Sequence, residues 1–144
     1  MIDLTNLEEI KKLDPEDVLG SINSFYKQCA QALEETERLN IPYLEGEVNN
    51  IIIPGMGGSA FAPEIVKTLF SQEIKVPYEI VRKYYLPAYA NKRSLVIISS
   101  YSATTKEAIS CGREAIEKGC QVFVICSKRD KNELVLFAKE KKLP

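Results

Sequence analysis

Residues 51–67 read IIIPGMGGSAFAPEIVK: three branched apolar residues, a turn with three glycines, a serine and an apolar helical pattern. A short apolar run that stops at Pro54 and Gly55 is typical of a strand buried on both faces of a parallel sheet. A helix is expected from about residue 60 to 70. The glycine turn then lies at the carboxyl end of a strand, which is where open parallel sheets bind ligands.

The alternation of strand and helix continues along the chain. Further strands are expected at residues 78–81, 95–98 and 122–126, and further helices at residues 105–118 and 132–142. Helices of this length between strands act as crossovers, so we expect a parallel sheet. The predicted fold class is therefore α/β, a three-layer αβα sandwich with four strands.

The region before residue 45 has a different pattern. Asp14 and Pro15 suit a helix start, and apolar side chains then recur every three or four residues, at Val18, Ile22, Phe25, Cys29 and Leu33. One long amphipathic helix is expected over residues 15–39. We expect residues 1–44 to form a helical segment that packs on a domain of residues 45–144, and this domain to end before a fifth strand.

Composition excludes several classes of protein. The chain has 144 residues, 45% of them apolar and 27% charged, with a net charge of −1, which is typical of a globular protein. No apolar run approaches the roughly 18 residues of a membrane helix, so a cytoplasmic location without membrane contact is expected. The four cysteines form no CxxC pair and are expected to be buried, reduced thiols, and no metal or organic cofactor is expected. Because histidine is absent, any acid or base must be of another type.

Two loops at expected strand ends suggest an anion site. The first, GMGGSA, places Gly57, Gly58 and Ser59 at a helix start, where backbone N–H groups and the helix dipole favour negative charge. The second, SSYSATTKE at residues 99–107, is rich in hydroxyl groups, and Thr104 and Glu107 have the spacing of a capping box. Hydroxyl groups donate to phosphate oxygens without a formal charge. Together the loops predict a pocket for a small phosphorylated ligand.

Other interpretations of these segments are open. Glycine turns and Ser/Thr caps often have no ligand, and the whole domain would then be structural. The turn matches neither G-x-G-x-x-G nor G-x-x-x-x-G-K-[ST], so a dinucleotide site is the weaker alternative. The basic run at residues 128–131 is interrupted by Asp130 and has no stacking aromatics, so nucleic acid is not an expected partner.

The motifs GMGGSA, RKYYLP, LVIISSYSATTKEAIS and EAIEKGCQVFVICS, in this order, resemble the sugar isomerase (SIS) domain, and most closely the N-terminal SIS domain of bifunctional phosphoglucose/phosphomannose isomerases. The resemblance spans residues 45–144 and implies a flavodoxin-like fold. It implies that the 6-phosphate of a hexose is bound by Gly57, Gly58, Ser59, Ser100, Ser102 and Thr105. Arg82 and Tyr101 would line the pocket.

Departures from the family pattern limit what the resemblance implies. Ala103 and Thr104 stand where the family has glycine and asparagine, and the segment SKRDKNEL replaces a serine followed by a glycine pair. The family's catalytic glutamate and ring-opening histidine lie in a second SIS domain. Glu64 and Glu107 are expected in first helical turns, where the dipole favours the charged form, so capping is a better interpretation than catalysis.

The sequence therefore predicts a domain that binds hexose 6-phosphates and contains no catalytic residue of its own. The expected partner is a second SIS domain or subunit, with a homodimer as the expected assembly. The parent activity implied is the interconversion of glucose 6-phosphate or mannose 6-phosphate with fructose 6-phosphate. The alternative is a non-catalytic sugar-phosphate sensor or assembly module.

Overall fold

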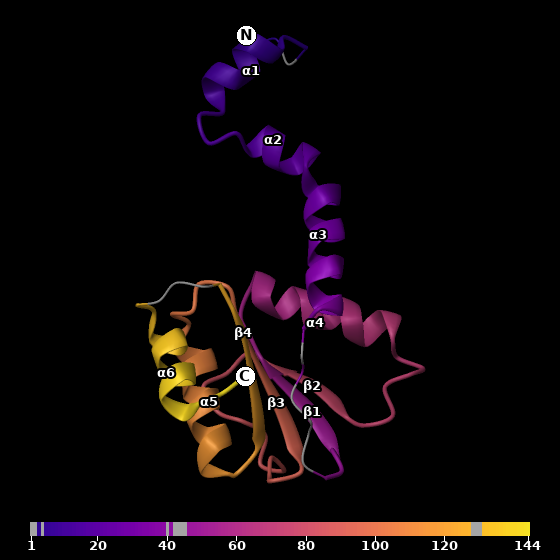
Figure 1. Ribbon diagram of the computed structural model, residues 1–144, viewed down its shortest axis with the longest axis vertical. Coiled ribbons are helices and arrows are strands. Elements are labelled where there is room, and N and C mark those ends of the chain that lie inside the picture. The colour runs from indigo at the N-terminus through magenta and orange to yellow at the C-terminus, as the bar shows by residue number, and fades with distance from the viewer. Residues whose placement is uncertain (1–2, 4, 40, 42–45, 128–130) are drawn as a thin grey trace. The chain divides into compact units, whose positions relative to one another are not determined.

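The computed structural model describes residues 3, 5–39, 41, 46–127 and 131–144. The chain divides into two compact units, Met1–Ile41 and Pro42–Pro144 (Figure 1). The described part of the first unit holds α1 (Leu7–Leu13), α2 (Val18–Asn23) and α3 (Phe25–Glu37). The second holds, in chain order, β1 (Asn50–Pro54), α4 (Gly58–Leu69), β2 (Tyr78–Val81), β3 (Ser94–Ser100), α5 (Lys106–Glu117), β4 (Gln121–Cys126) and α6 (Glu133–Lys141).

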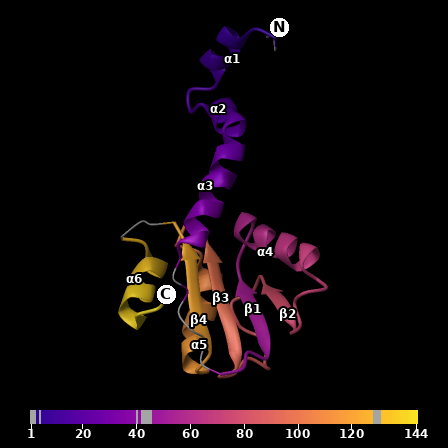
Figure 2. The ribbon, with the colours of Figure 1, turned by 45° about the vertical axis from the view of Figure 1, so that its right-hand side comes forward.

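The second unit is built on a four-stranded sheet of order β2-β1-β3-β4, which can be followed in Figure 2. All three pairings are parallel, with Ile51 beside both Tyr78 and Leu95, and Val96 beside Val122. The expected strands are therefore confirmed, and so is the parallel α/β sheet. The apolar runs allowed this prediction because each strand is covered by a helix on at least one face.

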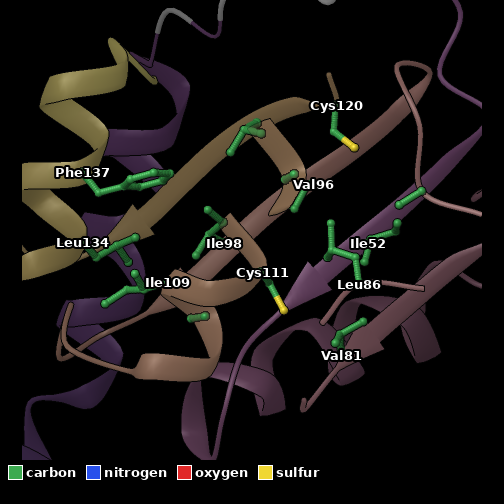
Figure 3. Close-up of a cluster of buried hydrophobic side chains, with 14 of the residues drawn as sticks. Ile52, Val81, Leu86, Val96, Ile98, Ile109, Cys111, Cys120, Leu134 and Phe137 are labelled. Carbon is green, nitrogen blue, oxygen red and sulfur yellow. The ribbon is translucent and has the colours of Figure 1, made fainter. Parts of the chain in front are cut away.

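The two faces of the sheet carry different helices. Side chains of Ile52, Val96 and Ile98 point to the face of α5 and α6, where they form the core with residues such as Ile109 and Leu134 (Figure 3). The opposite face meets α4, whose Pro63 carbonyl accepts a hydrogen bond of 3.2 Å from the Tyr78 hydroxyl. The order of layers is α4, sheet, then α5 with α6, which is the three-layer arrangement predicted (Figure 1).

The N-terminal unit differs from the single long helix expected over residues 15–39. The helix is interrupted at Ser24, which lies between α2 and α3 with φ −92° and ψ 1°. The Ser24 hydroxyl donates to the Ser21 carbonyl, a local side-chain bond that competes with helical bonding. The predicted helix start at Asp14 and Pro15 is wrong, because Asp17 is the N-cap of α2 and Asp14 is the C-cap of α1. The two Asp14 carboxylate oxygens nevertheless accept from the N–H groups of Val18 and Leu19, each at 2.8 Å.

The cysteines are only in part the buried thiols that were expected. Cys111 and Cys120 are buried, Cys126 is half-buried, and Cys29 on α3 is exposed. Burial raises the pKa of Cys111 to about 12, and the nearby Glu114 and Glu107 carboxylates add to this shift. Its thiol is therefore neutral and donates to the Lys83 carbonyl at 3.3 Å.

Candidate functional site

The carboxyl ends of the parallel strands meet at one edge of the sheet. The glycine turn follows β1 there, Ser100 closes β3, and Ser127 follows β4. An isolated bridge between Gly55 and Ser99 extends the contact between the first two segments. The two loops that the sequence singled out are thus neighbours in space.

The three glycines of the first loop meet different structural requirements. A Cβ on Gly55 would lie 3.0 Å from the Ser59 carbonyl oxygen and 3.3 Å from the Ser99 carbonyl oxygen, so Gly55 allows close packing of the protein itself. Gly57 has φ 52° and ψ −127°, a conformation that is almost restricted to glycine. Among the described residues nothing lies within 4 Å of a Cβ placed on Gly58, the first residue of α4, so they leave open space at this helix start.

That open space is chemically suited to an anion. The N–H groups of Ser59 and Ala60 bond to the carbonyls of Met56 and Gly57, each at 3.1 Å. Among the described residues, no hydrogen bond engages the N–H of Gly58. The first turn of α4 therefore offers a backbone donor beside the positive end of the helix dipole.

The second loop, residues 100–105, is called the hydroxyl loop below. The Ser100 hydroxyl donates to the Thr105 hydroxyl at 2.9 Å, and the Thr105 hydroxyl lies 3.3 Å from that of Ser102. The Thr104 hydroxyl donates to Ser102 at 3.2 Å. Ser102 is exposed and Thr105 half-buried, whereas Ser100 is only 1% exposed. Ser102 and Thr105 are thus open to a ligand, and Ser100 supports Thr105 from below.

Ser59 connects the two loops. Its hydroxyl accepts a hydrogen bond of 3.0 Å from the Tyr101 N–H. The structure therefore brings together Ser59, Ser100, Ser102 and Thr105, which the sequence had grouped. The Tyr101 side chain is 73% exposed, so Tyr101 joins the cluster through its backbone.

Ala103 has an unusual backbone conformation in the hydroxyl loop. Its φ is 56°, in the left-handed region that suits the family's glycine, and its N–H donates to the Ser100 carbonyl at 3.1 Å. The side chain is fully buried and belongs to the hydrophobic core. The alanine therefore carries backbone strain, but its methyl group packs in the core instead of narrowing the open side of the loop.

Ser127 and Asn132 are two contributors to this cluster that the sequence did not predict. The Ser127 backbone N–H and hydroxyl both donate to the Tyr101 carbonyl. The side-chain amide of Asn132 donates to the Ser102 carbonyl at 2.7 Å. Ser127 follows a strand end, which was an available signal, but no local pattern pairs Asn132 with a loop 30 residues earlier.

The capping box expected between Thr104 and Glu107 is wrong. The N-cap of α5 is Thr105, which makes no side-chain cap bond because its hydroxyl is engaged with Ser100 and Ser102. The Glu107 carboxylate instead raises the pKa of Tyr84 by its charge and by accepting a hydrogen bond from the phenol. Glu107 is thus occupied by a neighbouring loop.

Arg82 follows β2 and forms an ion pair with Glu64 of α4, with Nη2 and Oε1 2.9 Å apart. Both side chains are half-exposed, so the pair is screened and readily exchanged for another partner. Arg82 was expected to line the pocket, and the structure places it beside α4, the helix whose first residues are Gly58 and Ser59.

Within the described residues, no group of three or more His, Cys, Asp or Glu side chains is arranged for a metal ion.

None of the known protein-family models matches the chain. A curated protein of Caldicellulosiruptor bescii named bifunctional phosphoglucose/phosphomannose isomerase is 30% identical over 105 residues, or 73% of this chain and 31% of that protein. A protein of the same name from Thermoplasma acidophilum is 33% identical over 102 residues, or 71% of this chain and 32% of its own length. The chain thus spans about a third of the length of these relatives.

Two crystal structures share the fold. One is a candidate phosphosugar isomerase of Bacillus subtilis, with a TM-score of 0.55 and 21% identity over 64% of this chain and 29% of that one. The other, from Salmonella typhimurium, has a TM-score of 0.53 and 21% identity over 65% of this chain and 29% of that one. At this identity the likeness concerns the fold. Among the described residues no helix has the length and apolar character needed to cross a bilayer.

Proposed function

This chain carries an SIS-type domain, as its resemblance predicted, and from that premise we propose that it binds the phosphate of a hexose 6-phosphate for an aldose–ketose isomerase. The isomerase interconverts glucose 6-phosphate or mannose 6-phosphate with fructose 6-phosphate. The single observation that supports the proposal best is that the neighbouring Ser102 and Thr105 hydroxyls lie on a loop whose Tyr101 N–H is bonded to Ser59, at the start of α4. These groups are neutral, and they suit a ligand that must be released after each turnover.

The phosphate is bound between the two loops. The Ser102 and Thr105 hydroxyls and the Gly58 N–H donate to its oxygens, and the dipole of α4 stabilises its charge. Ser100 contributes indirectly, because its buried hydroxyl fixes the Thr105 hydroxyl. The sugar then extends toward the exposed side of the hydroxyl loop.

Proton transfer between C2 and C1 requires a carboxylate base, and opening of the ring requires an acid. Glu64 is paired with Arg82, and Glu107 accepts from Tyr84, so both carboxylates are already engaged by other side chains. We place the base and the acid in the second SIS domain or subunit. A sugar-phosphate sensor is the second candidate, and the occupied state of these two carboxylates is the observation in its favour.

The experiment is a backbone amide NMR titration with fructose 6-phosphate, with fructose and inorganic phosphate as controls. Saturable shifts are expected at Gly58, Ser59, Ser102 and Thr105 with the sugar phosphate. Ser102→Ala is expected to weaken binding about tenfold, since a hydrogen bond to a charged group is lost. Thr68→Ala on α4 removes an exposed hydroxyl outside the cluster and is expected to leave affinity unchanged. An absence of shifts at millimolar ligand contradicts the proposal.

Separately from the domain that would supply the base and the acid, we propose that a second copy of this domain associates with the first in a homodimer. Helix α4 buries Ala60 and Pro63 against the sheet, yet its outer side exposes Phe61 (65%), Ile65 (43%) and Leu69 (70%). Their spacing of four residues forms an apolar seam along one side of the helix. About a twofold axis near Ile65, an antiparallel copy would place Phe61 against the partner's Leu69, which makes the seam self-complementary.

Sedimentation velocity tests this assembly. The wild-type chain is expected to sediment as a dimer at micromolar concentration, and Leu69→Glu as a monomer, because a charge is then buried in the seam. Ser71→Glu adds the same charge at an exposed position just after α4 and is expected to remain dimeric. A wild-type monomer up to high micromolar concentration overturns the homodimer.

A further inference from the structure

We propose that Asn132 and Ser127 are positioning residues, which hold the hydroxyl loop in the conformation that presents its donors to the phosphate. The part of this inference that concerns ligand affinity rests on the proposed function. The part that concerns the conformation of the loop does not.

Three successive carbonyl groups of the hydroxyl loop are bonded to Ser127 after β4, to Asn132 before α6, and to Leu134 in the first turn of α6. The Tyr101 carbonyl accepts from Ser127, and the Ser102 carbonyl accepts from the Asn132 amide at 2.7 Å. The Ala103 carbonyl accepts from the Leu134 N–H at 3.0 Å. Segments about 30 residues apart are therefore joined by consecutive bonds along one side of the loop.

The orientation of these carbonyls determines the orientation of the amides. In a trans peptide the N–H points opposite to the preceding carbonyl, and the described residues contain no cis peptide. With the carbonyls of Tyr101 and Ala103 directed to Ser127 and Leu134, the N–H groups of Ser102 and Thr104 are directed away from them. The Thr104 N–H reaches the Ser102 hydroxyl at 3.4 Å, which keeps that hydroxyl on the open side.

The loop needs such external support. Ala103 at φ 56° lies in a conformation that costs a non-glycine residue about 1–2 kcal/mol, and strained backbone persists only where surrounding contacts determine it. Ser102 and Thr104 are exposed and provide little packing. The bonds from Ser127, Asn132 and Leu134 offset this cost together with the burial of the Ala103 methyl group.

A role as helix cap does not account for Asn132. It occupies the N-cap position of α6 with extended backbone, φ −80° and ψ 147°, but its side chain makes no cap hydrogen bond. The amide is directed to the Ser102 carbonyl instead. A serine at this position retains the capping preference but is too short to make the same bond. Asn132→Ser therefore separates the two roles.

The test compares Asn132→Ser with a matched control, Asn91→Ser. Asn91 also donates its side-chain amide to a backbone carbonyl, that of Tyr89 at 2.8 Å, but it lies in the loop before β3, at the opposite end of the sheet. Both variants are expected to lose a similar amount of stability. Only Asn132→Ser is expected to weaken binding of fructose 6-phosphate, by about tenfold. The conservative Ser127→Ala, which keeps the backbone donor, is expected to weaken it less.

A ligand-free measurement accompanies the titration. Hydrogen exchange of the Ala103 N–H, which bonds to Ser100, is expected to accelerate about tenfold in Asn132→Ser and to stay unchanged in Asn91→Ser. Unchanged exchange in Asn132→Ser overturns the positioning role. If the wild type does not bind fructose 6-phosphate, the proposed function fails, and the exchange measurement alone decides this inference.

Discussion

Replacing Ala103 with glycine tests whether the left-handed backbone of the hydroxyl loop carries strain. The residue has φ 56° and a fully buried methyl group, so the substitution has opposing effects on the free energy of unfolding. Relief of the left-handed conformation stabilises the fold by about 1–2 kcal/mol. Greater freedom of the unfolded chain costs about 0.4–1 kcal/mol, and loss of a buried methyl costs about 0.8 kcal/mol. The net change is expected to lie within about 1 kcal/mol of zero.

A matched substitution isolates the strain. Ala115 is equally buried but lies in α5, where glycine gains nothing from φ and reduces helix stability. Ala115→Gly is expected to destabilise the protein by about 2 kcal/mol, the sum of helix propensity and the lost methyl. Ala103→Val is expected to cost at least as much, because a β-branched residue fits the left-handed region poorly.

Urea unfolding of the three variants and the wild type measures these differences. The decisive quantity is the gap of about 1–2 kcal/mol between Ala103→Gly and Ala115→Gly. Equal destabilisation by the two glycine variants would refute the strain argument. Affinity for fructose 6-phosphate is expected to change less than threefold in Ala103→Gly, because the backbone already has the conformation that glycine favours.

Three further predictions concern other parts of the chain. The described residues provide no hydrogen-bond partner for the buried side-chain oxygen of Asn50, so Asn50→Leu is expected to raise the free energy of unfolding by about 1 kcal/mol in urea melts. A loss of stability would contradict this. In the native protein the exposed Cys29 thiol is expected to react rapidly with a disulfide reagent, whereas the buried Cys111 thiol is expected to react slowly. The Cys29→Ser variant is expected to lack the fast phase of this reaction. Burial opposes ionisation of Glu114, but the Leu86 N–H at 2.7 Å and Lys118 outweigh it and lower the pKa of Glu114. A carboxyl group whose pKa is lower in the folded state stabilises the fold above its unfolded-state pKa, and this stabilisation is lost as the pH falls through the folded-state pKa. Glu114→Gln is therefore expected to make the free energy of unfolding fall less steeply with decreasing pH below about pH 4.5. An unchanged acid limb would exclude Glu114 as its source.

The strands and their parallel order were predictable because short apolar runs separated by helices have few alternative arrangements. Ile51 to Ile53 and Leu95 to Ile98 lie in central strands of the sheet, and their composition reflects that position. The neighbourhood of Ser59, Ser102 and Thr105 was predictable for the same reason, since parallel strands end at one edge. These inferences depend on topology and not on side-chain detail.

Side-chain detail was less accessible to sequence. The helix break at Ser24 depends on one hydroxyl that bonds locally, and helical periodicity continues through it unchanged. A capping box was expected at Thr104 and Glu107, but the N-cap is Thr105, whose hydroxyl accepts from Ser100 and makes no cap bond. In both cases one polar side chain has two alternative hydrogen-bond partners whose free energies differ by about 1 kcal/mol. Composition and residue spacing do not show which partner is bound.

A loop without the family's glycine and asparagine keeps the Ser102 and Thr105 hydroxyls accessible, and these are the groups that we propose to bind phosphate. Glycine would allow the left-handed turn without strain, and alanine at position 103 does not. The cost is offset from outside the loop, by Asn132 and Leu134 of a segment that also departs from the family pattern. We infer that these departures compensate each other. Asn132→Ser is therefore expected to harm the loop less in an Ala103→Gly background than in the wild type, and a double-mutant cycle on the exchange rate of the residue 103 amide measures this coupling. Additive effects would mean that the two departures are independent.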